Sequence, residues 1–570
     1  MKSKKLGIVL AFMMAFVLAV AGCGGSQTAK NVEQKGDLSS KLTEIIKAEH
    51  PEKNPELAKN RKDTLIIGVD TPDGVLNSIY ADSAFDVKIC TTIFDTLLGK
   101  DPQGQPVPGI AEKWEISDNG MEYTFHLRKD ATFHDGSPVT AEDVAFPYYI
   151  MSDSSYDGPD DVFPILIKGC KEYRDGKATT IEGIQIIDPY TIKFMLEKPN
   201  ASAIYAFTEY YLPVLPKAYY GKDYKQGNTD GIKKLHRAPM GSGPYKFVQY
   251  KEGIETILAA NENYWKGKPK IKNIIYKATN ENTRIQMLSS GETDMDQVTV
   301  NARNIAQLKQ SGFLTIQMHP TNGYGYIGMN VANPMFSDPK VRQALTYGLN
   351  RKQVVDAVYE GYADVCNEPE SKVGWAFNPD VNQYEYNPEK AAQMLDEAGW
   401  KKGTDGVREK DGKKFVIHFT ASTPNPVNEA LIPIAKQNYE QLGITFIPEQ
   451  MEFNGVVKKQ KSGAAEMFFL AWGLNTDPDS SSVYKTKGAQ NYLNYSNPKV
   501  DALLEKGLIT MNLEERKKVY QELYKVLNED APYIYMYQRR DMYPINSRVQ
   551  GISISPYRKY PYDLWQAEII

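Results

Sequence analysis

The sequence predicts an α/β protein with more than one lobe. The chain has 570 residues, which is more than a single hydrophobic core normally serves. Segments typical of β-hairpins occur in its first half, whereas helices with clear start signals alternate with short strand-like segments in its second half. Helices and strands mixed along one chain in this way are typical of α/β architectures.

The N-terminus has the pattern of a secretion signal that ends at a cysteine. Three lysines precede an uncharged stretch whose apolar body covers residues 8–20. This body is short for a membrane-spanning helix, which needs about 20 apolar residues, and it fits a signal peptide over 1–22. The run Val20-Ala21-Gly22-Cys23 resembles the lipobox of bacterial lipoproteins, which implies that Cys23 carries a lipid anchor. An ordinary cleaved signal with a chance cysteine is the alternative.

Residues 23–63 are expected to form a flexible tether. Residues 24–62 contain no aromatic side chain and are rich in Lys, Glu, Asn and Ser. Leu42, Ile45 and Ile46 could form one short helix, but nothing here builds a core. A coil of about 30 residues would reach roughly 30 Å, so the folded part would stand just off a membrane.

The first half contains strand signals in order. Residues 65–69 form a short apolar run, as expected for a buried strand. Residues 114–128 predict a hairpin, because Asn119-Gly120 is a strong hairpin turn and the apolar side chains after it alternate. Residues 184–196 predict a second hairpin around Asp188-Pro189.

The second half contains helix start signals. Asp338-Pro339, Asn387-Pro388 and Asn497-Pro498 each place a capping residue before a proline at the first helical position. Asn512 with Glu515 resembles a capping box, and Gly399 and Gly507 stand where C-terminal caps are expected. Strand-like segments lie between the helices at 414–420, 444–448 and 466–471.

Composition excludes several classes of protein. The net charge is −4 and 24% of residues are charged, with the signs well mixed, so no nucleic-acid partner is expected. After Cys23 there remain three cysteines, at 90, 170 and 366, with no zinc-type spacing. One disulfide among them and three buried thiols are both compatible with the sequence.

No catalytic motif stands out. None of the six histidines forms a metal-type helical pair, and neither a nucleophile elbow nor a Walker loop occurs. Residues 323–328 match Gly-x-Gly-x-x-Gly by letter, but they read as a strand with alternating tyrosines and are not followed by a helix. We therefore expect no enzyme, no cofactor and no metal site.

Several sequence motifs occur in a fixed order: Ile93–Leu98, Pro108–Trp114, Phe125–Arg128, Phe133–Gly136, Thr140–Val144, Gly241–Tyr245, Asn263–Gly267, Val341–Leu345 and Asn350–Arg351. Together they resemble the motifs of one family, the extracellular solute-binding proteins of the oligopeptide, dipeptide and nickel class of ABC importers. The resemblance covers the chain from about residue 64 to the C-terminus.

The resemblance implies a periplasmic-binding-protein-like clamp of two α/β lobes, with an extra subdomain on the first lobe. Lobe one would comprise 64–95, 236–318 and 541–570. The extra subdomain would be 96–235, and lobe two 319–540. The chain would cross between the lobes near residues 319–328 and 537–543, where a glycine-rich, tyrosine-bearing segment could absorb changes in dihedral angle.

The resemblance also places ligand contacts in the turn around Trp472. In dipeptide and many oligopeptide binders, an aspartate three residues after this tryptophan pairs with the ligand's α-ammonium group. This chain has Asn475 there, which offers a neutral acceptor. Asp477 could replace it or could simply start the Asp-Pro turn.

A second anchor of dipeptide binders is an arginine in a loop of lobe two that holds the ligand carboxylate. The corresponding loop, 420–426, contains Thr423 and Asn425 as candidate contacts but no arginine. Without both anchors a short dipeptide fits poorly, and a longer peptide held through its backbone fits better. Further candidates are Leu76, Asn77, Tyr324, Tyr326, Tyr492 and Asn494; for the tyrosines a core role is the alternative.

We therefore expect a monomeric, lipid-anchored receptor on the outer face of the cytoplasmic membrane, or on its periplasmic face if an outer membrane exists. It would capture oligopeptides and deliver them to an ABC permease. Within the same class, the ligand could be a nickel chelate, an opine or a sugar, or the receptor could sense a peptide signal. An exported hydrolase is the alternative from a different class.

Overall fold

A computed structural model describes residues 43–570 of the chain. The predicted signal peptide, the lipidation at Cys23 and the first part of the expected tether lie outside the described residues. The described residues comprise the last part of the expected tether, residues 43–63, and the folded body from residue 64 onward.

Residues 43–63 are folded onto the body, so the prediction of a flexible tether up to residue 63 is wrong for this part. β1 (Glu44–Ile46), where a short helix was considered, pairs with β12 (Leu314–Pro320). Asn54 and Asn546 exchange two side-chain hydrogen bonds of 2.7 and 2.8 Å. Because these partners are hundreds of residues away, the composition of residues 43–63 alone could not reveal them.

The sheet nearest the N-terminus begins with the predicted strand at 65–69. β2 (Thr64–Val69) runs parallel to β11 (Asn273–Ala278), and β10 (Glu255–Ala260) and β9 (Tyr245–Lys251) continue the sheet in antiparallel order. Helix α3 (Ala84–Ile93) follows β2 along the chain and packs against β9.

A separate four-stranded sheet contains both predicted hairpins, in the order β5-β6-β8-β7. Tyr123, Phe125 and Leu127 are buried on one face, as their alternation predicted. The strands and the helix beside them are β5 (Ala111–Ile116), β6 (Glu122–Leu127), β7 (Ile184–Asp188), β8 (Thr191–Met195) and α4 (Ala141–Met151).

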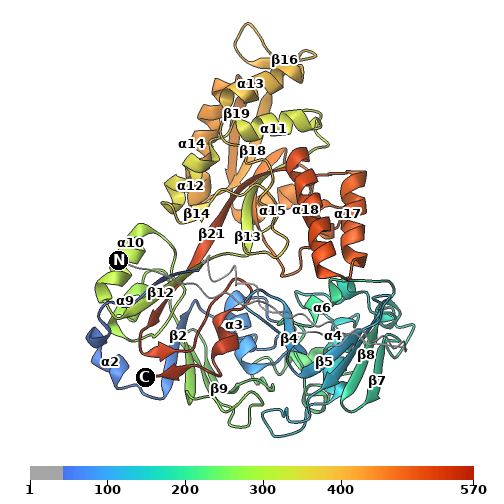
Figure 1. Cartoon of the computed structure of the whole chain (residues 1–570), viewed down its shortest axis with the longest axis vertical. Helices are drawn as coiled ribbons and strands as arrows, with labels where there is room; N and C mark the ends of the chain where they lie inside the picture. Colours follow the sequence, from blue (N-terminus) through green and yellow to red (C-terminus); the bar gives the residue numbers. More distant parts are fainter. Residues whose placement is uncertain (1–42) are drawn as a thin grey trace, which may run out of the picture. The chain divides into compact units, whose positions relative to one another are not determined.

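The largest sheet joins the two halves of the fold. Its order is β1-β12-β21-β13-β20-β18-β19, with β14 beside β21. The 14-residue strand β21 (Tyr533–Asn546) pairs with β13 (Gly323–Met329) through its first half and with β12 through its second half, and Figure 1 shows it running from one group of elements to the other. The letter match at 323–328 is therefore a strand, as expected. The other strands are β18 (Val416–Ser422), β19 (Thr445–Met451) and β20 (Met467–Gly473).

The predicted helix starts are confirmed by side-chain caps. Asp338, Asn387, Asn497 and Asn512 each accept a hydrogen bond from a backbone N–H in the first turn of their helix. The helices are α11 (Pro339–Tyr347), α13 (Pro388–Glu397), α17 (Pro498–Ile509) and α18 (Leu513–Asp530).

One predicted C-terminal cap is correct and the other is wrong. Gly399 adopts a φ of 89° just after α13, as such a cap requires. Gly507 lies inside α17, where a Cβ atom would come within 2.7 Å of the Tyr520 ring on α18. The glycine allows two helices to pack closely, and the helix ends two residues later.

The remaining elements are short or cover these sheets. They are η1 (Pro51–Lys53), α2 (Glu56–Lys59), β3 (Leu98–Lys100), β4 (Pro106–Pro108), η2 (Phe163–Ile165), α5 (Cys170–Arg174), α6 (Ala203–Ala206), α7 (Lys217–Tyr220), α8 (Asp230–Lys233), α9 (Arg284–Ser290), α10 (Ala302–Ser311), α12 (Arg351–Tyr359), β14 (Ala363–Asp364), β15 (Lys401–Lys402), β16 (Arg408–Lys410), β17 (Lys413–Lys414), α14 (Pro426–Gln441), α15 (Phe453–Lys461), α16 (Ser481–Tyr484), β22 (Val549–Gln550), η3 (Tyr560–Asp563) and β23 (Glu568–Ile569).

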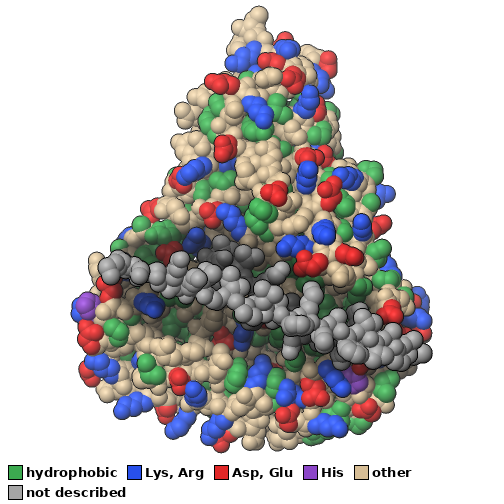
Figure 2. All heavy atoms as spheres, viewed as in Figure 1, with side chains coloured by type: hydrophobic (Ala, Val, Ile, Leu, Met, Phe, Trp, Pro, Cys, Tyr) green, Lys and Arg blue, Asp and Glu red, His purple; other side chains and the backbone are tan. Residues whose placement is uncertain are grey.

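The three cysteines of the described part are free, buried thiols. The alternative of one disulfide among them is therefore wrong. Within residues 43–570, none of the helices combines the length and apolar character needed to cross a bilayer. On the face in Figure 2, basic and acidic side chains are interspersed. The predicted boundaries of lobes and subdomain stay a prediction.

Candidate functional site

A cleft of about 390 Å³ lies where several separated parts of the chain meet. Its volume is within the usual range of ligand pockets. Both predicted crossings between the lobes contribute to it. The lining residues include Val87, Lys88 and Thr91 of α3, Lys100, Glu209 and Tyr210, His319 of β12 with Thr321 and Asn322 after it, Gly473 at the end of β20 with the next three residues, Arg539, Asp541 and Tyr543 of β21, and residues between 554 and 562.

Asn475, a predicted ligand contact, is one of the residues that line this cleft. β20 ends at Gly473, and the side-chain amide of Asn322 donates to the carbonyl oxygens of Leu474 and Asn475 at 2.8 and 3.0 Å. These bonds fix the backbone of the turn, while the Asn475 side chain stays exposed. A neutral amide at this position can both donate and accept hydrogen bonds.

Asp477 does not lie in the cleft, and its carboxylate is already bound by the protein. Arg516 of α18 donates to its two oxygens at 2.5 and 2.9 Å, and the Ser202 hydroxyl donates to it at 2.7 Å. Asp477 also accepts the backbone N–H of Asp479 at 3.0 Å, which is the turn-initiating role considered from the sequence. The alternative of Asp477 as an ammonium anchor is therefore wrong for this arrangement.

Trp472, Tyr324 and Tyr326 belong to a tyrosine-rich core and not to the cleft lining. Tyr324 and Tyr326 are only 4% and 1% exposed. Trp472 stacks on Tyr326 with ring centroids 6.0 Å apart and donates to the Tyr533 hydroxyl at 3.4 Å. These three residues have the core role, which was one of the alternatives that the sequence left open.

The loop after β18 is also outside the cleft. Asn425 caps α14 by accepting the backbone N–H groups of Val427 and Asn428, while the exposed Thr423 bonds through its backbone to Met451. Asn494 donates to the side chain of Asn330 at 3.1 Å, and neither it nor Tyr492 lines the cleft.

Leu76 and Asn77 are fully buried after β2 and do not reach the cleft either. Leu76 donates its backbone N–H to the backbone carbonyl of His236, and the side-chain oxygen of Asn77 accepts from the backbone N–H of Ile79. The lobe-one wall is instead formed by α3, one element later in the chain.

Sequence reasoning missed the charged side chains of the cleft. Lys88 is 8% exposed, and burial together with the charge of Lys559 lowers its pKa to about 8. Lys100 forms an ion pair with Glu209 at 2.7 Å. No spacing pattern could identify these lysines, because they come from segments that meet only in the fold.

His319 adds a buried polar group at the first crossing. It is 3% exposed, and its Nδ1 atom lies 3.0 Å from the carbonyl oxygen of Pro320. Since a carbonyl can only accept, Nδ1 carries the proton and Nε2 has no partner among the described residues. Burial lowers the pKa of His319, so the ring stays neutral at pH 7.

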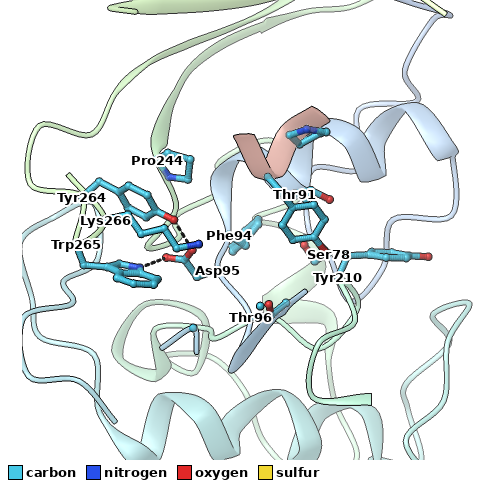
Figure 3. Close-up of a pocket in the computed structure, with 14 residues that line it drawn as sticks. Ser78, Thr91, Phe94, Asp95, Thr96, Tyr210, Pro244, Tyr264, Trp265 and Lys266 are labelled. Carbon is cyan, nitrogen blue, oxygen red and sulfur yellow. Dashed lines mark hydrogen bonds between the residues drawn. The ribbon is translucent and has the colours of Figure 1, made fainter. Parts of the chain in front are cut away.

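A second, much smaller cavity of about 40 Å³ contains Asp95. In Figure 3, Tyr264 and Trp265 point toward the Asp95 carboxylate, and each donates a hydrogen bond of 3.0 Å to it. Ser242 donates a third at 3.1 Å. Three of the sequence motifs that carry the resemblance thus meet at one carboxylate. The cavity adjoins the cleft, with which it shares Thr91, Tyr210, Pro561 and Tyr562.

The model of one protein family, described as bacterial extracellular solute-binding proteins, family 5 middle, matches residues 105–494. The chain belongs to this family. This confirms the family resemblance drawn from the sequence motifs and names solute binding, not catalysis, as the family's function.

Known proteins similar to this family 5 chain include peptide and nickel binders. The chain is 27% identical to the oligopeptide-binding protein AppA of Bacillus subtilis, over 100% of this chain and 99% of AppA. The solved structure of that AppA in complex with a nonapeptide has a TM-score of 0.71, 26% identity, and coverage of 90% of this chain and 99% of AppA. NikZ of Campylobacter jejuni in complex with Ni(L-His) has a TM-score of 0.70 and 26% identity, with 89% and 99% covered.

These structural matches confirm the two-lobed α/β fold of this family 5 protein. Within the described residues, no group of three or more His, Cys, Asp and Glu side chains is placed to hold a metal ion. Besides neutral polar groups, the lining of the cleft includes lysines, Arg539 and the carboxylates of Glu209 and Asp541.

Proposed function

We propose that this protein is a lipid-anchored extracellular receptor that binds oligopeptides in the cleft and delivers them to an ABC importer. The observation that carries the proposal is the turn at residues 473–475. Gly473, Leu474 and Asn475 line the cleft, and none of their side chains carries a charge. An extended peptide can pair with such a backbone whatever its own side chains are.

The two anchors of dipeptide binders are missing from the positions where the sequence motifs place them, which favours peptides longer than two residues. Asn475 stands where an aspartate is expected to bind the ligand's ammonium group. The carboxylate of Asp477 is already paired with Arg516. The loop at 420–426 offers no arginine to a carboxylate. The likeness to AppA, whose solved structure holds a nonapeptide, supports the same inference.

Native mass spectrometry of the gently purified protein tests the proposal. A ladder of co-purified peptides several residues long, released by mild denaturation, is the expected result. Release of one fixed small mass would contradict peptide binding, and turnover of added peptides would favour the hydrolase instead.

A nickel chelate is the second candidate, because the structure of NikZ with Ni(L-His) matches this fold. The chelator would have to supply most metal ligands, since the described residues provide no cluster for a metal. Elemental analysis of the same preparation separates the two candidates: nickel in stoichiometric amount would favour the chelate.

A further inference from the structure

Lys88 is a buried cation without a carboxylate in contact. It lies on α3 at the wall of the cleft, and its Nζ atom donates to Oε1 of Gln297 at 3.1 Å. It forms no ion pair with any of the residues that the structure describes. Lysines are almost never buried in this way unless they are paired.

Two of the three carboxylates whose charges act on Lys88 are engaged elsewhere. Asp70 forms an ion pair with Arg284 at 2.7 Å. Asp296 accepts hydrogen bonds from the Thr279 hydroxyl at 2.8 Å and from the Gln297 backbone N–H at 2.7 Å. Their fields reach Lys88, but neither contacts it.

A second lysine increases the positive charge at this wall. Lys559 belongs to the C-terminal segment that also lines the cleft. Its positive charge adds to burial in lowering the pKa of Lys88. The segment reaches α3 because η3, directly after Lys559, packs on that helix. Asp541 of β21 also lines the cleft, and its negative charge acts on both lysines. Within residues 43–570 it forms no ion pair of its own.

Two like charges facing one solvent-filled cleft repel each other in the ligand-free protein, and an anion between them would relieve that repulsion. A carboxylate is the anion that a peptide carries. We propose that Lys88 and Lys559 form a carboxylate-binding site, which holds the C-terminal carboxylate or an acidic side chain of the bound peptide. This inference rests on the proposed peptide-binding function and identifies the part of the peptide that the protein recognises through its charge.

Titration calorimetry at pH 7 with three probe peptides tests the site. The probes are penta-alanine with a free C-terminus, penta-alanine amide, and an amidated pentapeptide with a central glutamate. The wild-type protein should bind one or both carboxylate-bearing probes at least tenfold more tightly than penta-alanine amide. The probe that gains affinity shows whether the terminus or the side chain is the source.

Lys88→Met and Lys559→Met should each remove that preference and leave the affinity for penta-alanine amide within about twofold, while the exposed Lys518→Met serves as matched control. Equal binding of all three probes, or a preference that survives in both variants, would overturn the carboxylate site while leaving peptide binding intact. Failure of every probe to bind would count against the proposed function itself.

A second readout does not depend on peptides. Succinate at millimolar concentration should raise the melting temperature of the wild-type protein and of Lys518→Met, but not that of Lys88→Met. Circular dichroism of each variant checks its fold. Equal stabilisation of wild type and Lys88→Met by succinate would overturn the site even if no peptide probe binds.

Discussion

Arg516 and Asp477 form a two-point ion pair in which the guanidinium donates to both carboxylate oxygens, at 2.5 and 2.9 Å. Both side chains are at least nine-tenths buried. Ser202 from the 96–235 region donates to the same carboxylate, and the backbone N–H of Ala201 donates to Leu508 at 2.7 Å. The pair therefore ties the helices α17 and α18 to the region before α6.

Replacing Arg516 by Met should destabilise the protein by about 3–5 kcal/mol, because it leaves a buried carboxylate without its cation. Urea unfolding followed by circular dichroism measures the change. The exposed Arg303→Met is the matched control and should have little effect. Ser202→Ala removes one hydrogen bond and should cost about 1 kcal/mol. An Arg516→Met protein as stable as wild type would mean that the pair is not formed in solution.

Asn475→Asp should increase the affinity for peptides with a free N-terminus by about tenfold or more, since a charge-assisted hydrogen bond to the ammonium group is worth about 1.5–3 kcal/mol. Calorimetry with penta-alanine and its N-acetylated form measures the effect, which only the free amine should show. Asn304→Asp, outside the cleft, is the matched control. Equal gains for both peptides would show that Asn475 does not face the ligand's N-terminus.

The stability of the ligand-free protein should rise with pH through the titration of Lys88. Burial and Lys559 lower the pKa of Lys88 from 10.5 to about 8, against the opposing fields of Asp296, Asp541 and Asp70. Between these values the unfolded chain binds the proton more tightly, so stability increases as the pH rises.

From pH 7 to 9.5 this group contributes an increase of about 2 kcal/mol in the free energy of unfolding. Lys88→Met should lack that increment, so the difference between the two proteins in urea unfolding should grow with pH by this amount. Parallel pH profiles for wild type and Lys88→Met would contradict a buried, uncompensated lysine.

Cys23→Ser should release the protein from the membrane fraction if Cys23 carries the lipid. Fractionation and immunoblotting of cells that express each form measure the release. Ligand affinity should not change, because the cleft lies entirely within the described residues 43–570. A variant that stays with the membrane would show that another attachment exists.

Features determined by neighbouring residues were predictable from the sequence. The cap at Asn497 and the turn at Asn119-Gly120 depend on side chains within three positions of the backbone they bind. Gly507 was misassigned because the reason for the glycine is Tyr520, on another helix. The strand at Glu44–Ile46 was missed for the same reason, since its partner β12 is far along the chain.

The candidate site was predictable only in part. The position of Asn475 followed from a motif, and the structure places it in the cleft. The motif could not show that Asp477 is occupied, because Arg516 and Ser202 are supplied by distant segments. Lys88 and Lys559 had no signal at all, since a lysine's partners and burial are properties of the folded chain.

The strand β21 has a consequence for how the molecule melts. One continuous strand supplies hydrogen bonds to β13 through its first half and to β12 through its second half. Neither half of the fold can lose its order without taking part of the other's ladder with it, which favours a single cooperative unfolding transition. Any ligand that stabilises the cleft, which β21 also lines, would then protect the whole binding body from thermal denaturation.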